Sequence, residues 1–84
     1  MNSAQQATLE RVFATPIDGN LAWSRIESLL QAVGCTVVEG KGSAVTFLNN
    51  GRKLTLHRPH PAKEALRYRV LAAREYLEKI GVTP

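Results

Sequence analysis

The stretch Cys35–His57, CTVVEGKGSAVTFLNNGRKLTLH, decides the fold of this 84-residue chain. It contains three short strand candidates: CTVVE is rich in β-branched residues, while SAVTFL and KLTLH alternate apolar and polar residues, as in strands with one buried face. Lys41-Gly42 separates the first two runs, and Asn50-Gly51 separates the last two. Asn-Gly is the strongest short signal for a two-residue hairpin turn. The stretch therefore predicts a three-stranded antiparallel meander.

The Asn-Gly turn also predicts how the second and third strands pair. If Asn50 and Gly51 are the two loop residues, each step back along one strand matches a step forward along the other. One face of the pair is then apolar and packs on the core, while the other stays open. A shift by one residue would exchange the two faces, so the hydrophobic pattern supports this register. The predicted pairs are Asn49 with Arg52, Phe47 with Leu54, Thr46 with Thr55, Val45 with Leu56, and Ala44 with His57.

Helices are expected both before and after the meander in the sequence. Residues 3–15 read as a first helix that the following proline ends. Residues 21–34 repeat apolar side chains at helical spacing, with Ser24 and Glu27 placed as a capping box. Residues 67–81 form the last helix. Helices packed on one face of such a sheet give an α+β two-layer domain.

Length and charge narrow the class of protein. A chain of 84 residues is expected to form one domain, here with a core over 21–82 and a helical extension over 3–15. The net charge is +4, and residues 40–74 carry eight Lys or Arg against one acidic residue, Glu64. Such a segment attracts nucleic acid or an acidic protein, and a solvated basic surface is the alternative.

The single cysteine and the lack of long apolar runs bear on location. Cys35 has no second cysteine for a disulfide, so a reducing cytoplasm is the expected location. No window approaches the roughly 18 apolar residues of a membrane span, so no membrane association is expected.

The two histidines, His57 and His60, are the candidate catalytic groups. Two histidines without a nearby cysteine or carboxylate make a weak metal site, so neither metal nor cofactor is expected. A ribonuclease needs a base, an acid and cations, and histidine suits the first two roles. The alternative is that His57 ends a strand and His60 stiffens a loop. Candidates for RNA contacts are Lys41, Ser43, Arg52, Lys53, Arg58, Lys63, Arg67 and Arg69.

Ser43 and Tyr68 are two further candidates for a functional role. Ser43 could act as a nucleophile only with a base beside it, and no triad spacing is visible in the sequence. Tyr68, between Arg67 and Arg69, is the aromatic residue to consider for base stacking, although packing is the commoner role of such residues.

Three short features accompany the predicted element order. Gly42, Ser43 and Phe47 open the second strand, a loop with Pro59 and His60 follows the third, and the last helix ends in a Gly-Val pair. With these features the chain resembles the HicA toxins. These are small RNA-cleaving components of type II toxin–antitoxin systems, and their fold is similar to the double-stranded-RNA-binding domain.

The resemblance covers about Trp23 to Val82, so the helix over 3–15 is an addition to the minimal family fold. It implies an endoribonuclease, an mRNA interferase that inhibits translation by cutting mRNA. It also implies two partners: RNA and a HicB-like antitoxin protein that neutralises the toxin.

One position departs from the family pattern. The typical family motif is Gly-Ser-His-x-x-Phe, in which the histidine is catalytic, and Ala44 stands at that position here. Three explanations are open: a disabling substitution, a divergent site that uses His57, or a natural non-catalytic RNA-binding or regulatory protein. The expected function is thus a HicA-like RNA-binding toxin with weakened or absent cleavage, and the alternative is a basic protein-interaction module. The catalytic positions that the resemblance and the register point to are Ala44, His57 and His60.

Overall fold

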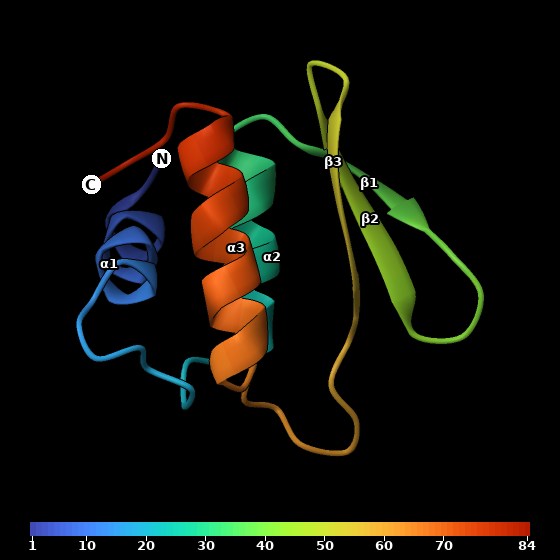
Figure 1. Cartoon of the computed structure of the whole chain (residues 1–84), viewed down its shortest axis with the longest axis horizontal. Helices are drawn as coiled ribbons and strands as arrows, with labels where there is room; N and C mark the ends of the chain where they lie inside the picture. Colours follow the sequence, from blue (N-terminus) through green and yellow to red (C-terminus); the bar gives the residue numbers. More distant parts are fainter.

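The computed structural model describes all residues from Met1 to Pro84 and contains three helices and one three-stranded sheet (Figure 1). Helices α2 and α3 lie between the sheet and α1, which packs on the outer side of the helical layer. None of the helices is long and apolar enough to cross a membrane. The predicted α-α-β-β-β-α order and α+β class are confirmed. The elements are α1 (Ser3–Val12), α2 (Trp23–Ala32), β1 (Thr36–Glu39), β2 (Ala44–Asn49), β3 (Arg52–His57) and α3 (Arg67–Lys79).

The predicted hairpin register is confirmed. Asn50 and Gly51 have φ angles of 49° and 81°, which is the left-handed geometry that a tight hairpin turn needs. The order in the sheet is β1-β2-β3, and both neighbouring pairs are antiparallel. On the open face, the hydroxyls of Thr46 and Thr55 lie 2.7 Å apart. The β2–β3 pairs are Ala44 with His57, Val45 with Leu56, Thr46 with Thr55, Phe47 with Leu54, and Asn49 with Arg52.

One core lies between the sheet and the helices. Val45 and Phe47 of β2 are fully buried, and Trp23 of α2 packs edge-on against Phe47 with ring centroids 6.2 Å apart. Leu9 and Val12 of α1 belong to the same buried cluster. The added helix therefore shares the core of the sheet and the other two helices.

Helix α1 is shorter than predicted. It ends at Val12, not at residue 15. Arg74 of α3 donates from Nε to the carbonyl of Val12 (2.8 Å) and from Nη2 to the carbonyl of Ala14 (2.6 Å). These carbonyls at the end of the helix have no partner within the helix, and Arg74 supplies one.

The start of α2 also differs from the prediction. The N-cap is Ala22, without a side-chain cap, so Ser24 and Glu27 do not form a capping box. The carboxylate of Glu27 instead accepts hydrogen bonds from the indole Nε1 of Trp23 and from the guanidinium of Arg58. Glu27, which the sequence pattern assigned to capping the helix, thus bonds to Arg58 from a distant part of the chain.

Candidate nucleic-acid interface

The centre of the candidate site is the end of the β2–β3 ladder, where Ala44 pairs with His57. Both residues lie on the open face of the sheet, and the ring Nδ1 of His57 lies 3.2 Å from Oγ of Ser43. The backbone next to them is held as well, because the amide of Arg58 donates to the carbonyl of Ser43 (2.9 Å). The hairpin therefore brings His57 of β3 next to Ala44, as the register predicted, and next to Ser43, which precedes β2.

The pairing of Ser43 with His57 corrects one part of the sequence reading. The sequence showed no base near Ser43, yet the register places an imidazole within hydrogen-bonding reach. His57 is exposed, and its second ring nitrogen makes no hydrogen bond within the protein. No cluster of His, Cys, Asp or Glu in the structure could hold a metal ion. Histidine is the residue type best suited to proton transfer, and His57 is the histidine at this end of the sheet.

Arg58 lies beside the site but is committed to two carboxylates. It contacts Glu27 from Nε (2.7 Å) and Nη2 (3.1 Å), and Glu39 from Nη1 (2.6 Å) and Nη2 (2.9 Å). These bonds hold the pKa of Glu39 below its usual value. Since both charges are compensated, Arg58 joins the end of β1 to α2 and offers no free charge to a phosphate, contrary to the sequence-based assignment.

Arg69 likewise has a structural role. It is only 7% exposed, and it donates from Nε to the carbonyl of His57 (2.7 Å) and from Nη1 to the carbonyl of Ala65 (3.0 Å). Its guanidinium also lies over the ring of Tyr68, at 4.7 Å from the centroid. Arg69 therefore holds the end of β3 against α3 and is not accessible to a phosphate.

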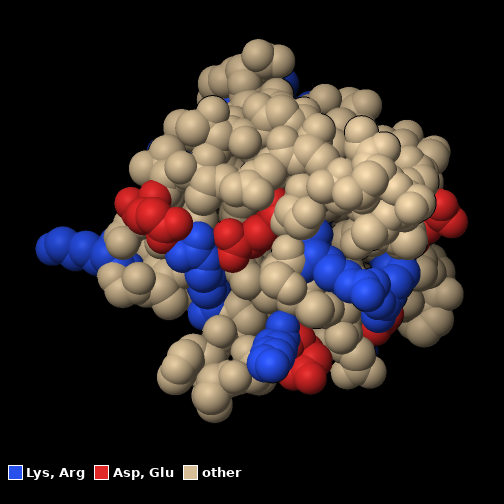
Figure 2. Space-filling view, turned by 180° about the vertical axis from the view of Figure 1, so that it is seen from behind, with Lys and Arg blue, Asp and Glu red and all other residues tan.

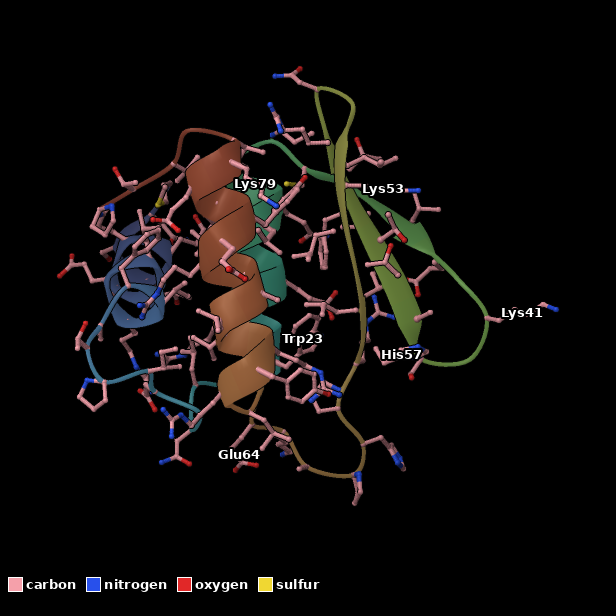
Figure 3. The ribbon with its side chains drawn as sticks, in the orientation of Figure 1. Trp23, Lys41, Lys53, His57, Glu64 and Lys79 are labelled. Atoms are coloured by element: carbon pink, nitrogen blue, oxygen red, sulfur yellow. The ribbon has the colours of Figure 1, made fainter.

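The remaining candidates fall into separate regions. Near the His57 end, Lys41 extends into solvent from the β1–β2 loop (Figure 3). His60 and Lys63 are exposed in the segment between β3 and α3. Arg52 and Lys53 lie at the opposite end of β3, close to Lys79 at the end of α3 (Figure 3). The side chain of Arg67 lies against Gly19 in the α1–α2 loop.

The charges on the surface are mixed. On the face shown in Figure 2, acidic side chains lie between the basic ones, and no continuous basic field is present. The excess of basic residues over 40–74 is thus partly compensated by acids from other segments, among them Glu27 and Glu39 at Arg58. On this face, a polyanion would have to be held by local groups of side chains.

Comparison with known proteins gives one match. Residues 23–82 match the family model described as HicA toxin of bacterial toxin–antitoxin. The chain belongs to this family. No curated protein and no solved structure matches it.

The family match bears directly on the site. In this HicA family member, the matched residues run from the start of α2 to just beyond α3 and include the whole sheet. Ser43, Ala44 and His57 therefore lie within the matched region, whereas α1 lies outside it. The candidate site described above belongs to the matched part of the chain.

Proposed function

We propose that this HicA family member is an RNA-binding toxin whose RNA-cleaving step is weak or absent. The observation that supports this is the pairing of Ala44 with His57 on the open face of the sheet, beside Ser43. The resemblance assigns a catalytic histidine to position 44. In this chain Ala44 leaves His57 as the one imidazole at this end of the strand pair.

The chemistry of RNA cleavage explains what a second imidazole would add. In RNA cleavage a base takes the proton of the ribose 2′-OH, the 2′ oxygen bonds to phosphorus, and the phosphorus–O5′ bond breaks. An acid then protonates the departing O5′. Directly opposed residues have β-carbons about 4.5–5.5 Å apart. A histidine at position 44 would therefore stand beside His57, and the two rings could serve as base and acid around one phosphate.

The proposal also names the partners. The RNA is mRNA, whose cleavage by an active form would inhibit translation in the cytoplasm. A HicB-like antitoxin protein neutralises the toxin, as the family's place in toxin–antitoxin systems suggests. His60, in the exposed loop after β3, is a second histidine that could contribute once RNA is bound.

The test restores the missing imidazole. Ala44→His, expressed from a tightly controlled promoter, should arrest growth and cleave single-stranded RNA in vitro, while the present chain should do neither. Ala44→Gln is the matched control, because it adds similar bulk without a titratable ring. Cleavage by Ala44→His should be lost when His57→Ala is added. An inactive but folded Ala44→His protein that binds RNA would refute the assignment of the site.

A second candidate function is favoured by two exposed apolar residues. Val38 is 45% and Leu48 is 37% exposed, and both lie on the open face of the sheet. Such residues suit a protein-interaction module whose basic surface docks an acidic partner. Replacing Arg52 and Lys53 with glutamate should abolish RNA binding if the first proposal holds. If the second holds, RNA binding is absent from the start and Leu48→Asp prevents partner binding.

A further inference from the structure

We propose that a single strand of RNA lies in the groove between β3 and α3. One base stacks on Tyr68, near His57. The phosphates farther along the strand are held by Arg52, Lys53 and Lys79 at the other end of the groove. This inference rests on the proposed RNA binding and names the surface that performs it.

The groove is a built feature of the fold. A cavity of about 330 Å³ lies at the basic end, lined by the first three residues of β3 and by the C-terminal part of α3. Its floor is tied together, because the hydroxyl of Tyr76 donates to the carbonyl of Arg52 (2.9 Å) and thus joins helix to strand. Arg52, Lys53 and Lys79 line it against a single acid, Glu75, so its lining has a net positive charge. This charge complements a phosphate backbone.

Tyr68 lies on the same side of α3 as the groove. It precedes Ala72, Glu75 and Lys79 by four, seven and eleven residues, the spacing of one helical face. At 1.5 Å per residue, the distance along α3 from Tyr68 to Lys79 is about 16 Å. The strand β3 has nearly the same length, about 17 Å, at 3.3–3.4 Å per residue. The two walls therefore match in length.

The two walls run in opposite directions, so each end of the groove combines a strand end with a helix end (Figure 1). At one end, Lys53 and Lys79 lie near each other (Figure 3). At the other end, the guanidinium of Arg69 bridges the carbonyl of His57 and the ring of Tyr68. A strand that follows the groove thus passes from the basic end to Tyr68, and it has to cross the edge of β3 to reach His57 on the open face of the sheet.

Tyr68 has the properties of a stacking platform. It is 59% exposed, which is unusual for a large aromatic side chain. Arg69 covers one face of its ring, and two backbone carbonyls hold that guanidinium in place. The ring is therefore preorganised with its other face available to a base. Stacking needs an unpaired base, so the groove should select single-stranded over double-stranded RNA.

The experiment measures binding of a fluorescently labelled single-stranded RNA of about 12 nucleotides by anisotropy. Titrations are repeated from about 50 to about 200 mM salt to obtain the salt slope of the affinity. The variants are Tyr68→Ala, Tyr68→Phe and Lys53→Gln/Lys79→Gln. Arg25→Gln, on the exposed surface of α2, is the control for loss of one positive charge outside the groove. A strand of equal length without bases and an RNA duplex serve as comparison ligands.

Tyr68→Ala should weaken binding at least about fivefold with an unchanged salt slope, because it removes a stack and no ion pair. Tyr68→Phe should bind like the parent chain, and the abasic strand should not distinguish Tyr68→Ala from the parent. The double lysine variant should lower the slope by roughly 1.4, and Arg25→Gln should bind as the parent does.

Two results would overturn the groove while leaving the proposed function intact. One is RNA binding that Tyr68→Ala leaves unchanged, and the other is duplex binding equal to or tighter than single-strand binding. If the parent chain binds no RNA at low salt, the proposed function itself fails, and the groove fails with it. The two failures are thus distinguishable.

Discussion

Arg58→Ala is the substitution that most directly tests how the site is held. In the parent chain the guanidinium joins Glu27 of α2 to Glu39 at the end of β1, and the Arg58 amide holds the carbonyl of Ser43. Truncation removes every side-chain bond and leaves the backbone bond in place. The carboxylate of Glu27 then keeps only the indole of Trp23 as a partner.

The expected loss of stability comes mainly from Glu27. Its side chain is 20% exposed and accepts two charged hydrogen bonds from Arg58, at 2.7 and 3.1 Å. Hydrogen bonds to charged groups contribute about 1.5–3 kcal/mol. The bonds to Glu39 are exposed to solvent and screened, so they add little. We expect the free energy of unfolding to fall by about 2 kcal/mol, which lowers the Tm of a domain of this size by roughly 10 °C.

The assay is thermal and urea unfolding followed by circular dichroism, with Glu39→Gln as the matched control. Glu39→Gln should change stability much less than Arg58→Ala. The pH dependence gives a second readout, because Arg58 lowers the pKa of Glu39 in the folded state. That contribution is present above the ordinary pKa of the carboxyl and is lost as pH falls through the lowered value. Arg58→Ala should remove this acid-side loss. Equal effects of the two substitutions, or a loss below about 0.5 kcal/mol for Arg58→Ala, would refute the reasoning.

Two other predictions concern α3. Burial raises the pKa of Tyr76 to about 12, so the stability that its neutral form provides should be lost as pH rises from about 10 to about 12. In Tyr76→Phe the ultraviolet ionisation step near pH 12 should disappear, and the free energy of unfolding should fall by about 1 kcal/mol; an unchanged step would assign the raised pKa to another group. Leu66 precedes α3 with φ 72° and ψ 157°, a region used almost only by glycine. Leu66→Gly should therefore raise the free energy of unfolding by about 1 kcal/mol in urea titrations, and a loss of stability would contradict this strain.

The sheet was predictable because one local signal determined it. The Asn50-Gly51 turn set the register, and the alternation of Val45, Phe47 and their partners excluded a shift. Helix ends were less predictable, since distant groups decide them. Arg74 completes the end of α1 from more than sixty residues away, and the Glu27 carboxylate is taken by Arg58 rather than by its own helix end.

The site was predictable only in part for the same reason. The pairing of Ala44 with His57 followed from the turn. Extending the ladder by one residue pairs Ser43 with Arg58, so the register alone does not predict the contact of Ser43 with His57. A count of basic residues could not show that Arg58 and Arg69 are already bonded. Most of the groups that bond to Arg58 and Arg69 lie far away in the sequence, so the distribution of charge along the chain cannot identify them. The sequence could indicate only the bond between Trp23 and Glu27, because these two residues are four apart on one helix.

The contribution of α1 to the core has a consequence for how this protein unfolds. Leu9 and Val12 are almost fully buried in the common cluster, and Arg74 bonds to the end of the helix. The cooperative unit is therefore larger than the family match over 23–82. Amide protons in α1 should exchange with solvent in the same global opening as those of β2. A fragment limited to the family region would leave part of this apolar cluster uncovered and prone to self-association.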